Sequence, residues 1–320
     1  MTTTQSIKVG MIGLGKMGQN HLRILSMLKT VELVFIHDAN AEVAKRLSSQ
    51  YGIPVSADPI AELGAVDAVV IATPTSTHSE YVKKIGGKVK NIFVEKPLAA
   101  TLQEAEDLHA YATAEKINLM VGFIERFNPA VQGIKRVLDR SSRVVSIDFT
   151  RTNKLSARIT DVDVVTDLMI HDIDLALYLN GPIKSMEAHG MAHGAMIDFA
   201  SALLTHENGR FSRIQASRIT EKKMRSIQAT CLDMFVDCEL VRKEIVINRQ
   251  SEIRQVEGEP YTISAIEEAV EVKPQEALLS ELQAFIASCA GGAAEGLPDA
   301  HAGLEAMRVC ARIQESILHG

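Results

Sequence analysis

A histidine and its neighbouring aspartates lie on one predicted helix in the middle of the chain. Asp167 and His171 are four residues apart in the run DLMIHDID, so they share a helix face, and Asp174 follows a turn later. An imidazole has a pKa near neutrality, so it can take a proton from an alcohol as hydride leaves the carbon. Asp167 could orient the imidazole or hold a substrate hydroxyl, whereas Asp172 points elsewhere and is interpreted as structural. A packing role for His171 remains the alternative.

A lysine occupies the motif Glu95-Lys96-Pro97, directly after a predicted strand in the first half of the chain. Ligands of open α/β sheets bind beyond the carboxyl ends of the strands, which is where Lys96 is expected. Near another positive charge and partly desolvated, its ammonium group would hold its proton less tightly, which suits hydrogen bonding to a reacting hydroxyl. A solvated surface lysine is the alternative interpretation.

The run GLGKMG, from Gly13 to Gly18, follows the first predicted strand and opens the first predicted helix. A dinucleotide-binding turn requires this placement. Gly13 permits the tight turn, Gly15 lets the backbone approach a pyrophosphate, and Gly18 lets the helix and strand pack closely. The N–H groups and partial positive charge at the helix N-terminus would hold the anion.

An acidic residue supports the nucleotide interpretation, because Asp38 ends the second predicted strand, 20 positions after Gly18. A carboxylate there can accept both ribose hydroxyls of the adenosine and would repel a 2′-phosphate. No arginine follows at Ala39 or Asn40 to bind such a phosphate. The sequence therefore predicts NAD rather than NADP. A structural turn followed by a surface aspartate is the alternative.

The run ATPTSTH, from Ala72 to His78, follows another predicted strand. Its Thr-Pro-Thr turn could shape the wall beside the nicotinamide ribose. A stiff turn, with Thr77 as a helix cap and His78 at the surface, is an equal alternative. The candidate cofactor-binding residues are Gly13, Gly15, Lys16, Met17, Gly18, Asp38, Thr73, Pro74, Thr75, His78, Glu95 and Lys96.

The elements that must position these groups change in type near residue 123. The first 120 residues alternate apolar runs with amphipathic segments, as a parallel sheet with crossover helices does. Thr77 with Glu80, and Thr101 with Glu104, form predicted capping boxes. The predicted strands span residues 7–12, 32–37, 68–72, 91–94 and 119–121.

The second half reads as helices combined with hairpin-linked strands. Asn128-Pro129 predicts the start of a helix to about residue 138, followed by a strand at 144–150 and a helix at about 164–179. Asn208-Gly209 predicts a type I′ hairpin. Further strands are expected to about residue 256, then helices at about 275–290 and 301–318. Hairpins imply an antiparallel or mixed sheet.

Composition and charge exclude several classes of protein. The chain has 320 residues, 46% hydrophobic and 23% charged, which predicts a globular protein of two domains. A net charge of -6 gives no reason to expect a nucleic-acid partner. No apolar run is long enough for a membrane helix, and the start lacks a signal-peptide pattern, so we expect a cytoplasmic protein.

The cysteines and remaining histidines do not predict a metal site. The four cysteines lack metal-like spacing, and reduced thiols are favoured over disulfides. His189 and His193 are four residues apart, but Gly190 and Gly194 make a helix there unfavourable.

These motifs in this order resemble the Gfo/Idh/MocA oxidoreductases, named for glucose–fructose oxidoreductase and inositol dehydrogenase. The match covers most of the chain: GLGKMG, Asp38, the Thr-Pro turn with His78, EKP, GFIERFNP, and Asp167 with His171. The resemblance implies an α/β Rossmann domain with a mostly parallel sheet, at residues 1–123. An α+β domain for substrate binding and oligomerisation, with an open, mostly antiparallel sheet, would follow at 124–320.

The resemblance also implies active-site roles for Lys96, Asp167 and His171. The family varies in whether its lysine or its histidine takes the proton. We assign His171 as the general base, and Lys96 as the group that orients the hydroxyl and stabilises negative charge developing on its oxygen.

A narrower resemblance concerns the substrate. GFIERFNPAV and ARITDVDVVTDLMIHDID are similar to the subgroup that oxidises the 3-hydroxyl of UDP-N-acetylglucosamine. Arg126, Asn128 and Arg158 are candidates for contacting the substrate, including its diphosphate, because guanidinium groups bind phosphate in a bidentate manner. Interdomain salt bridges are the alternative. We expect a homodimeric or homotetrameric sugar dehydrogenase. The alternatives are a myo-inositol or free-sugar dehydrogenase and a non-catalytic NAD-binding regulator.

Overall fold

The computed structural model describes residues 6–154, 162–254, 262–292 and 296–319. Contacts divide the chain into two compact units: Met1–Ile124 with Ala277–Arg308, and Glu125–Glu276 with Val309–Gly320. Sequence analysis assigned the segment Ala277–Arg308 to the second domain, whereas its contacts place it in the first unit. Within the described ranges, no helix has both the length and the apolar character needed to cross a membrane.

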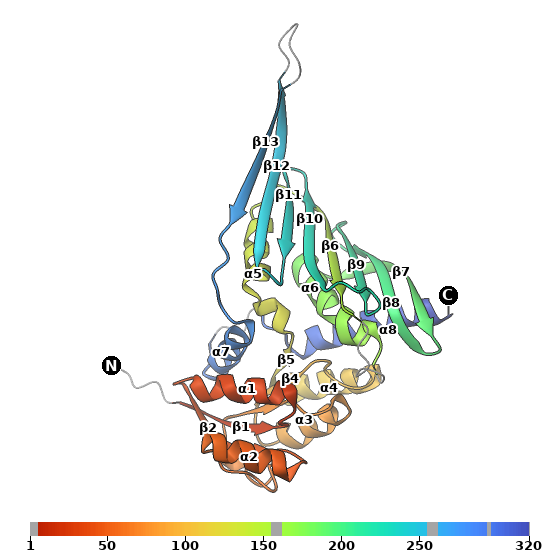
Figure 1. Ribbon diagram of the computed structural model, residues 1–320. Coiled ribbons are helices and arrows are strands. Elements are labelled where there is room, and N and C mark those ends of the chain that lie inside the picture. The colour runs from red at the N-terminus through yellow and green to blue at the C-terminus, as the bar shows by residue number, and fades with distance from the viewer. Residues whose placement is uncertain (1–5, 155–161, 255–261, 293–295, 320) are drawn as a thin grey trace. The chain divides into compact units, whose positions relative to one another are not determined.

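The first unit contains a five-stranded sheet in the order β2-β1-β3-β4-β5, with every pairing parallel (Figure 1). All five predicted strands are present, with bounds within one residue of those expected. Strand β3 is buried along its whole length, as a fully apolar strand covered on both faces requires. The strands are β1 (Ile7–Ile12), β2 (Val31–His37), β3 (Ala68–Ile71), β4 (Asn91–Glu95) and β5 (Asn118–Gly122).

The strand order creates the position where a ligand is expected. Strand β1 pairs with both β2 and β3, so the chain reverses its direction of winding between β1 and β3. In open parallel sheets, ligands bind at the carboxyl ends of the strands beside this point. The turn that begins at Gly13 follows β1, and the turn that begins at Thr73 follows β3, so both lie at that edge.

Five helices complete the first unit's main elements, and α1 and α7 lie side by side (Figure 1). Helix α7 comes from the returning segment, and its Phe285 packs edge-on against Phe93 of β4, with 5.6 Å between ring centroids. The helices are α1 (Lys16–Met27), α2 (Ala41–Tyr51), α3 (His78–Gly86), α4 (Leu102–Ala114) and α7 (Ala277–Cys289).

One predicted capping box is confirmed and the other is wrong. At the start of α4, the Thr101 side chain accepts a hydrogen bond from the Glu104 backbone N–H, and the Glu104 side chain accepts one from the Thr101 backbone N–H. The Thr77 side chain instead donates to the carbonyl oxygen of Pro74, because a 3-10 turn at Thr75–Thr77 precedes α3. Glu80 pairs with Lys84 on the exposed side of α3.

The second unit contains an eight-stranded sheet in the order β13-β12-β11-β10-β6-β9-β8-β7 (Figure 1). Only β6 and β9 pair in parallel among these strands, so the expected mostly antiparallel sheet is confirmed. Strand β13 lies beyond the last strand that we predicted. The strands are β6 (Val144–Thr152), β7 (Ile183–His193), β8 (Met196–His206), β9 (Phe211–Ser217), β10 (Met224–Cys231), β11 (Met234–Glu239), β12 (Glu244–Arg254) and β13 (Thr262–Val270).

Helices α5 (Pro129–Leu138) and α6 (Ile170–Asn180) pack against one face of this sheet. The Asn128 side chain accepts a hydrogen bond from the Ala130 N–H, which confirms the predicted helix start. A π-helical turn at Val165–Met169 leads into α6, where we expected one continuous α-helix. Helix α8 (Ala300–His319) belongs to the first unit up to Arg308 and to the second unit from Val309.

The hairpin between β8 and β9 is present, but its turn is not type I′. A type I′ turn needs a positive φ at both central residues. Gly209 has a φ of 80°, whereas Asn208 is not among the residues with positive φ. The Gly209 N–H donates to the carbonyl of His206, so a tight turn precedes Gly209. The asparagine side chain instead donates to the carbonyl of Asn180.

Candidate functional site

A pocket of about 520 Å³ opens at the edge of the first sheet, beside the turns that follow β1, β2 and β3. Seven of the predicted cofactor residues line it: Gly13, Gly15, Lys16, Met17, Asp38, Thr73 and Pro74. The lining also includes residues that sequence analysis did not select, namely His37, Ala39, Asn40, Ala72, Thr77 and Tyr81. Most of these adjoin selected residues in the chain. Tyr81 lies four residues after Thr77, a spacing that brings it to the same side of α3.

The glycines of the first turn differ in what surrounds them. Gly13 has a φ of +94°, a conformation that favours glycine. A Cβ on Gly18 would lie 2.1 Å from the carbonyl oxygen of Gly13, so the start of α1 packs directly on the turn. A Cβ on Gly15 would meet no protein atom within 4 Å. The pocket therefore has open space at Gly15, where a pyrophosphate is expected.

The N-terminus of α1 is suited to an anion. No side chain caps it, and its first turn contains no acidic residue. Its first N–H groups can therefore be directed at a phosphate, and the helix dipole favours negative charge there. Lys16, the first residue of the helix, is exposed at the pocket wall. The residues present fit a dinucleotide.

The Asp38 carboxylate links the end of β2 to the glycine turn. Its Oδ2 accepts a hydrogen bond from the Leu14 N–H at 2.6 Å, and its Oδ1 accepts one from the Asn40 N–H at 2.7 Å. Each carboxylate oxygen has further acceptor capacity. Asp38 therefore fixes the turn through its backbone contacts and still has lone pairs for the ribose hydroxyls that we expect it to bind.

The surface alternative for His78 is wrong, because this side chain is 1% exposed. Its Nδ1 lies 2.9 Å from the carbonyl oxygen of Pro97, and its Nε2 lies 3.1 Å from the carbonyl oxygen of Thr73. Burial lowers its pKa. His78 does not line the pocket, and it touches two segments that carry candidate residues.

The EKP segment ends β4 in a defined arrangement. Glu95 accepts a hydrogen bond from the Lys96 backbone N–H through Oε2, and its Oε1 lies 2.6 Å from Nε2 of His21. Lys96 is half-buried. Neither Glu95 nor Lys96 lines the pocket, and Gly18, Thr75 and His78 also lie outside its lining. Sequence analysis did not identify His21, although it follows the glycine motif on the same helix.

In the second unit, Asp167 and His171 are both half-buried around the start of α6. Asp167 lies within the π-helical turn, in which the Ile170 N–H donates to the carbonyl of Val165. Such turns occur frequently at functional sites. The spacing of four residues between Asp167 and His171 does not reveal this change from a π-helical turn to an α-helix.

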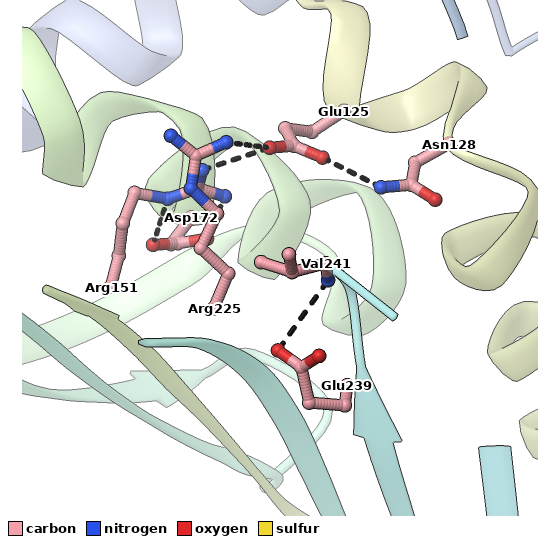
Figure 2. Close-up of polar contacts among 7 residues, drawn as sticks. All are labelled: Glu125, Asn128, Arg151, Asp172, Arg225, Glu239 and Val241. Atoms are coloured by element: carbon pink, nitrogen blue, oxygen red, sulfur yellow. Dashed lines mark hydrogen bonds and ion pairs between the residues drawn. The ribbon is translucent and has the colours of Figure 1, made fainter. Parts of the chain in front are cut away.

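Two arginine–aspartate pairs hold the first turns of α6. Arg151 of β6 donates to both carboxylate oxygens of Asp172, each at 2.8 Å (Figure 2). Arg126 donates to both oxygens of Asp174, at 2.8 and 2.6 Å. Burial raises the pKa of both aspartates, and the paired guanidinium groups oppose that rise. Both aspartates follow His171 within one turn of α6, and the structural role predicted for Asp172 agrees with its contacts.

The first of these pairs belongs to a larger buried cluster (Figure 2). Glu125 accepts from Arg151 at 2.8 Å and from the Asn128 side chain at 3.1 Å, and Arg225 lies 3.7 Å from the same carboxylate. Burial acts to raise the pKa of Glu125, but Arg151, Asn128 and Arg225 together hold that pKa below its usual value. The cluster joins α6, the strands β6 and β10, and the segment before α5.

Two of the three residues predicted to contact the substrate, Arg126 and Asn128, are described, and both are buried in the second unit. Arg126 is 8% exposed, and its guanidinium also lies over the Tyr178 ring, 4.8 Å from the centroid. The salt bridge of Arg126 to Asp174 lies within the second unit and is not interdomain. Asn128 is 9% exposed; its side chain caps α5 by accepting from the Ala130 N–H and donates to the Glu125 carboxylate. Arg158 lies outside the described residues.

Comparison with known proteins matches both units. A family model described as "Oxidoreductase family, NAD-binding Rossmann fold" matches residues 7–123, and one described as "GFO/IDH/MocA C-terminal domain" matches residues 143–233. The chain is 29% identical to a UDP-N-acetylglucosamine 3-dehydrogenase from Acidithiobacillus ferrooxidans, over 88% of each chain. It is 26% identical to an inositol 2-dehydrogenase from Rhizobium meliloti, over 94% of each chain.

The fold is also similar to solved structures. A structure of the Acidithiobacillus ferrooxidans UDP-N-acetylglucosamine 3-dehydrogenase superposes with a TM-score of 0.86 at 26% identity, covering 98% of both chains. The similarity therefore extends over both units rather than over the nucleotide domain alone.

A pair of glycine substitutions separates the turn's cofactor role from its structural role. We expect Gly15→Ala to fold normally, because the added methyl group meets no protein atom. That methyl group would occupy pyrophosphate space and should raise the Kd for NAD by about tenfold or more. Titration calorimetry and thermal melting measure the two effects. Gly18→Ala is the contrasting variant, and we expect its melting temperature to fall because Gly13 blocks the new Cβ. Normal NAD affinity in Gly15→Ala would contradict the assignment.

A matched pair of arginine substitutions tests the buried cluster. Arg151→Met leaves Glu125 and Asp172 buried without their main partner, and the free energy of unfolding should fall by about 3–5 kcal/mol. Arg213→Met removes an exposed pair with Asp148 in the same unit and should cost less than about 1 kcal/mol. Urea denaturation of both variants measures these values. Equal, small losses would show that the cluster does not stabilise α6.

Proposed function

Because the chain belongs to the Gfo/Idh/MocA oxidoreductase family, we propose that it oxidises a secondary hydroxyl of a nucleotide-linked sugar with NAD. The proposed substrate is UDP-N-acetylglucosamine or a related nucleotide sugar, oxidised at its 3-hydroxyl. The observation that carries this proposal is the similarity to the Acidithiobacillus ferrooxidans enzyme over 98% of both chains. A myo-inositol or free-sugar dehydrogenase is the second candidate, supported by the Rhizobium meliloti relative.

The nucleotide pocket supports NAD as the cofactor of this reaction. The open space at Gly15 and the uncapped N-terminus of α1 suit the pyrophosphate. Asp38 lies at the pocket wall, where its carboxylate can accept the adenosine ribose hydroxyls and oppose a 2′-phosphate. When bound, NAD supplies the acceptor for the hydride that leaves the sugar carbon.

The proton chemistry is assigned to this chain's own side chains. We propose that the His171 imidazole takes the proton of the sugar hydroxyl, because a neutral imidazole is a competent base near neutral pH. The Lys96 ammonium would donate a hydrogen bond to the same oxygen and stabilise its developing negative charge. Asp167 would orient the imidazole or hold a neighbouring hydroxyl. The diphosphate contact is proposed for Arg158.

The buried pairs around α6 support the role of His171. Asp172 and Asp174, which follow His171 in the sequence, each accept two hydrogen bonds from one guanidinium group. A bidentate pair fixes direction as well as distance. The helix backbone directly after His171 is therefore held at two positions, one and three residues along the chain. Preorganisation of this kind is what a general base needs.

We also propose that the chain forms a homodimer or homotetramer through the sheet face that α5 and α6 leave uncovered. Strand pairing places Leu203, Phe211 and Phe235 on that face, with exposures of 46%, 41% and 38%. Apolar side chains gathered on one exposed face are typical of protein–protein contacts. The family resemblance implies a second copy of the chain as the occupant.

The substrate proposal predicts a ranked response to three alcohols. The enzyme with NAD should produce reduced nicotinamide with UDP-N-acetylglucosamine at a higher kcat/KM than with myo-inositol or free N-acetylglucosamine. Absorbance at the nicotinamide band follows the reaction. Oxidation of myo-inositol alone would reject the nucleotide sugar and support the second candidate. Absence of turnover with every alcohol would favour a non-catalytic NAD-binding protein.

The role assignments predict a separation of turnover from cofactor binding. We expect Lys96→Ala and His171→Ala each to lower kcat by about a hundredfold or more. The Kd for NAD should change by no more than about twofold, because neither side chain lines the nucleotide pocket. Steady-state kinetics and calorimetry measure the two quantities. Unchanged turnover in both variants would overturn the assignment.

The oligomer proposal predicts that charge on the open sheet face separates the subunits. The double variant Leu203→Glu, Phe235→Glu should be monomeric by sedimentation velocity. Leu232→Glu is a matched control, because Leu232 is 63% exposed but lies in the turn between β10 and β11. The control should keep the wild-type assembly. An unaltered assembly in the double variant would show that another surface holds the subunits together.

A further inference from the structure

Two buried histidines of the first unit contact the EKP segment, one at Glu95 and one at Pro97. His21, on α1, is fully buried, and its Nε2 lies 2.6 Å from Oε1 of Glu95. His78, at the start of α3, is 1% exposed, and its Nδ1 lies 2.9 Å from the carbonyl oxygen of Pro97. Lys96 is the residue between these two contact points.

The contact of His21 has a defined donor. Its Nδ1 is buried and has no hydrogen-bond partner within the described part of the chain. An ionised carboxylate oxygen accepts, so Nε2 is the ring nitrogen that carries a proton and donates a hydrogen bond to Glu95. The other carboxylate oxygen accepts the backbone N–H of Lys96 at 3.2 Å.

The surroundings keep this carboxylate in one place. Glu95 has 12% of its side chain exposed, and a Cβ on Gly122 of β5 would lie 3.0 Å from its Oε2. Glycine at that position leaves the space that the carboxylate occupies. The Phe93 ring packs edge-on against the His21 ring, with 5.2 Å between centroids. The carboxylate therefore connects α1 to the backbone of Lys96 with little freedom.

The contact of His78 connects the same segment to the nucleotide pocket. Its second nitrogen, Nε2, lies 3.1 Å from the carbonyl oxygen of Thr73, and Thr73 lines that pocket. Burial lowers the pKa of His78, and the neutral ring donates its one N–H to Pro97 in one tautomer and to Thr73 in the other. His78 therefore lies between the turn after β3 and the residue after Lys96.

We propose that His21 and His78 are positioning residues that set the Lys96 side chain for catalysis and tie its backbone to the cofactor turns. This inference rests on the role of Lys96 in the proposed function. A lysine side chain has four flexible carbons, so its ammonium is placed accurately only if the backbone that carries it is fixed. Hydrogen bonds to the residues immediately before and after Lys96 provide that restraint.

A matched pair of amide substitutions tests His21. The side-chain nitrogen of glutamine takes the place of Nε2, whereas that of asparagine takes the place of Nδ1, which has no partner. His21→Gln should keep near wild-type kcat, and His21→Asn should lower kcat by about tenfold or more. The Kd for NAD should stay within about twofold in both variants, because His21 does not line the pocket.

The corresponding pair at His78 should separate two effects. His78→Asn keeps a donor toward Pro97 and should mainly weaken NAD binding, since the Thr73 contact is lost. His78→Gln keeps a donor toward Thr73 and should mainly lower kcat, since the Pro97 contact is lost. Equal effects of Asn and Gln on kcat and on Kd at both histidines would overturn the proposal, because simple loss of packing does not distinguish the two amides.

A readout that does not depend on turnover keeps this test separate from the proposed function. The Lys96 backbone amide donates to Glu95, so its ¹H–¹⁵N resonance reports the contact directly. The resonance should move in His21→Asn and remain near its wild-type position in His21→Gln. His206→Asn, at another fully buried histidine in the second unit, controls for general destabilisation and should not move it. An unmoved Lys96 resonance in His21→Asn would reject the inference even if no sugar is oxidised.

Discussion

The close approach of the chain to itself at the glycine turn is the constraint on which the nucleotide pocket depends. Gly18 packs so tightly on the carbonyl of Gly13 that a side chain is excluded, and this contact brings the N-terminus of α1 to the carboxyl end of β1. The Asp38 carboxylate then joins the turn to the end of β2. The space left open beside Gly15 follows from these contacts, and so does the direction of the helix N–H groups.

Buried polar contacts likewise restrain the backbone near Lys96 and His171, the two residues proposed to act in catalysis. In the first unit, the Glu95 carboxylate accepts a hydrogen bond from the backbone N–H of Lys96 and so restrains the backbone that carries the lysine side chain. In the second unit, Asp172 is held by Arg151 beside His171. Burying charge is costly unless it is paired, so such contacts persist where geometry is more important than stability alone. Each unit thus supplies one candidate group on a rigid support.

Sequence analysis predicted the elements well and the side-chain surroundings less well. The parallel strands were predictable because runs buried on both faces are wholly apolar, and Asn128 signalled a helix start through its residue type. The capping box at Thr77 was wrong because a 3-10 turn precedes α3, and the type I′ turn at Asn208 was wrong because only Gly209 has a positive φ. The burial of His78 and the contact of His21 depend on segments that meet only in three dimensions. No local pattern could reveal them.

The transfer of hydride from a sugar carbon is the central claim, and isotopic labelling tests it most directly. The enzyme would be incubated with NAD and UDP-N-acetylglucosamine deuterated at C3 of the sugar, and the reduced nicotinamide analysed by mass spectrometry. The account predicts that the deuterium appears on the nicotinamide and that turnover slows relative to the unlabelled sugar. Reduced nicotinamide without deuterium would contradict oxidation at that carbon, and the absence of any reduced nicotinamide would contradict the dehydrogenase assignment for this substrate.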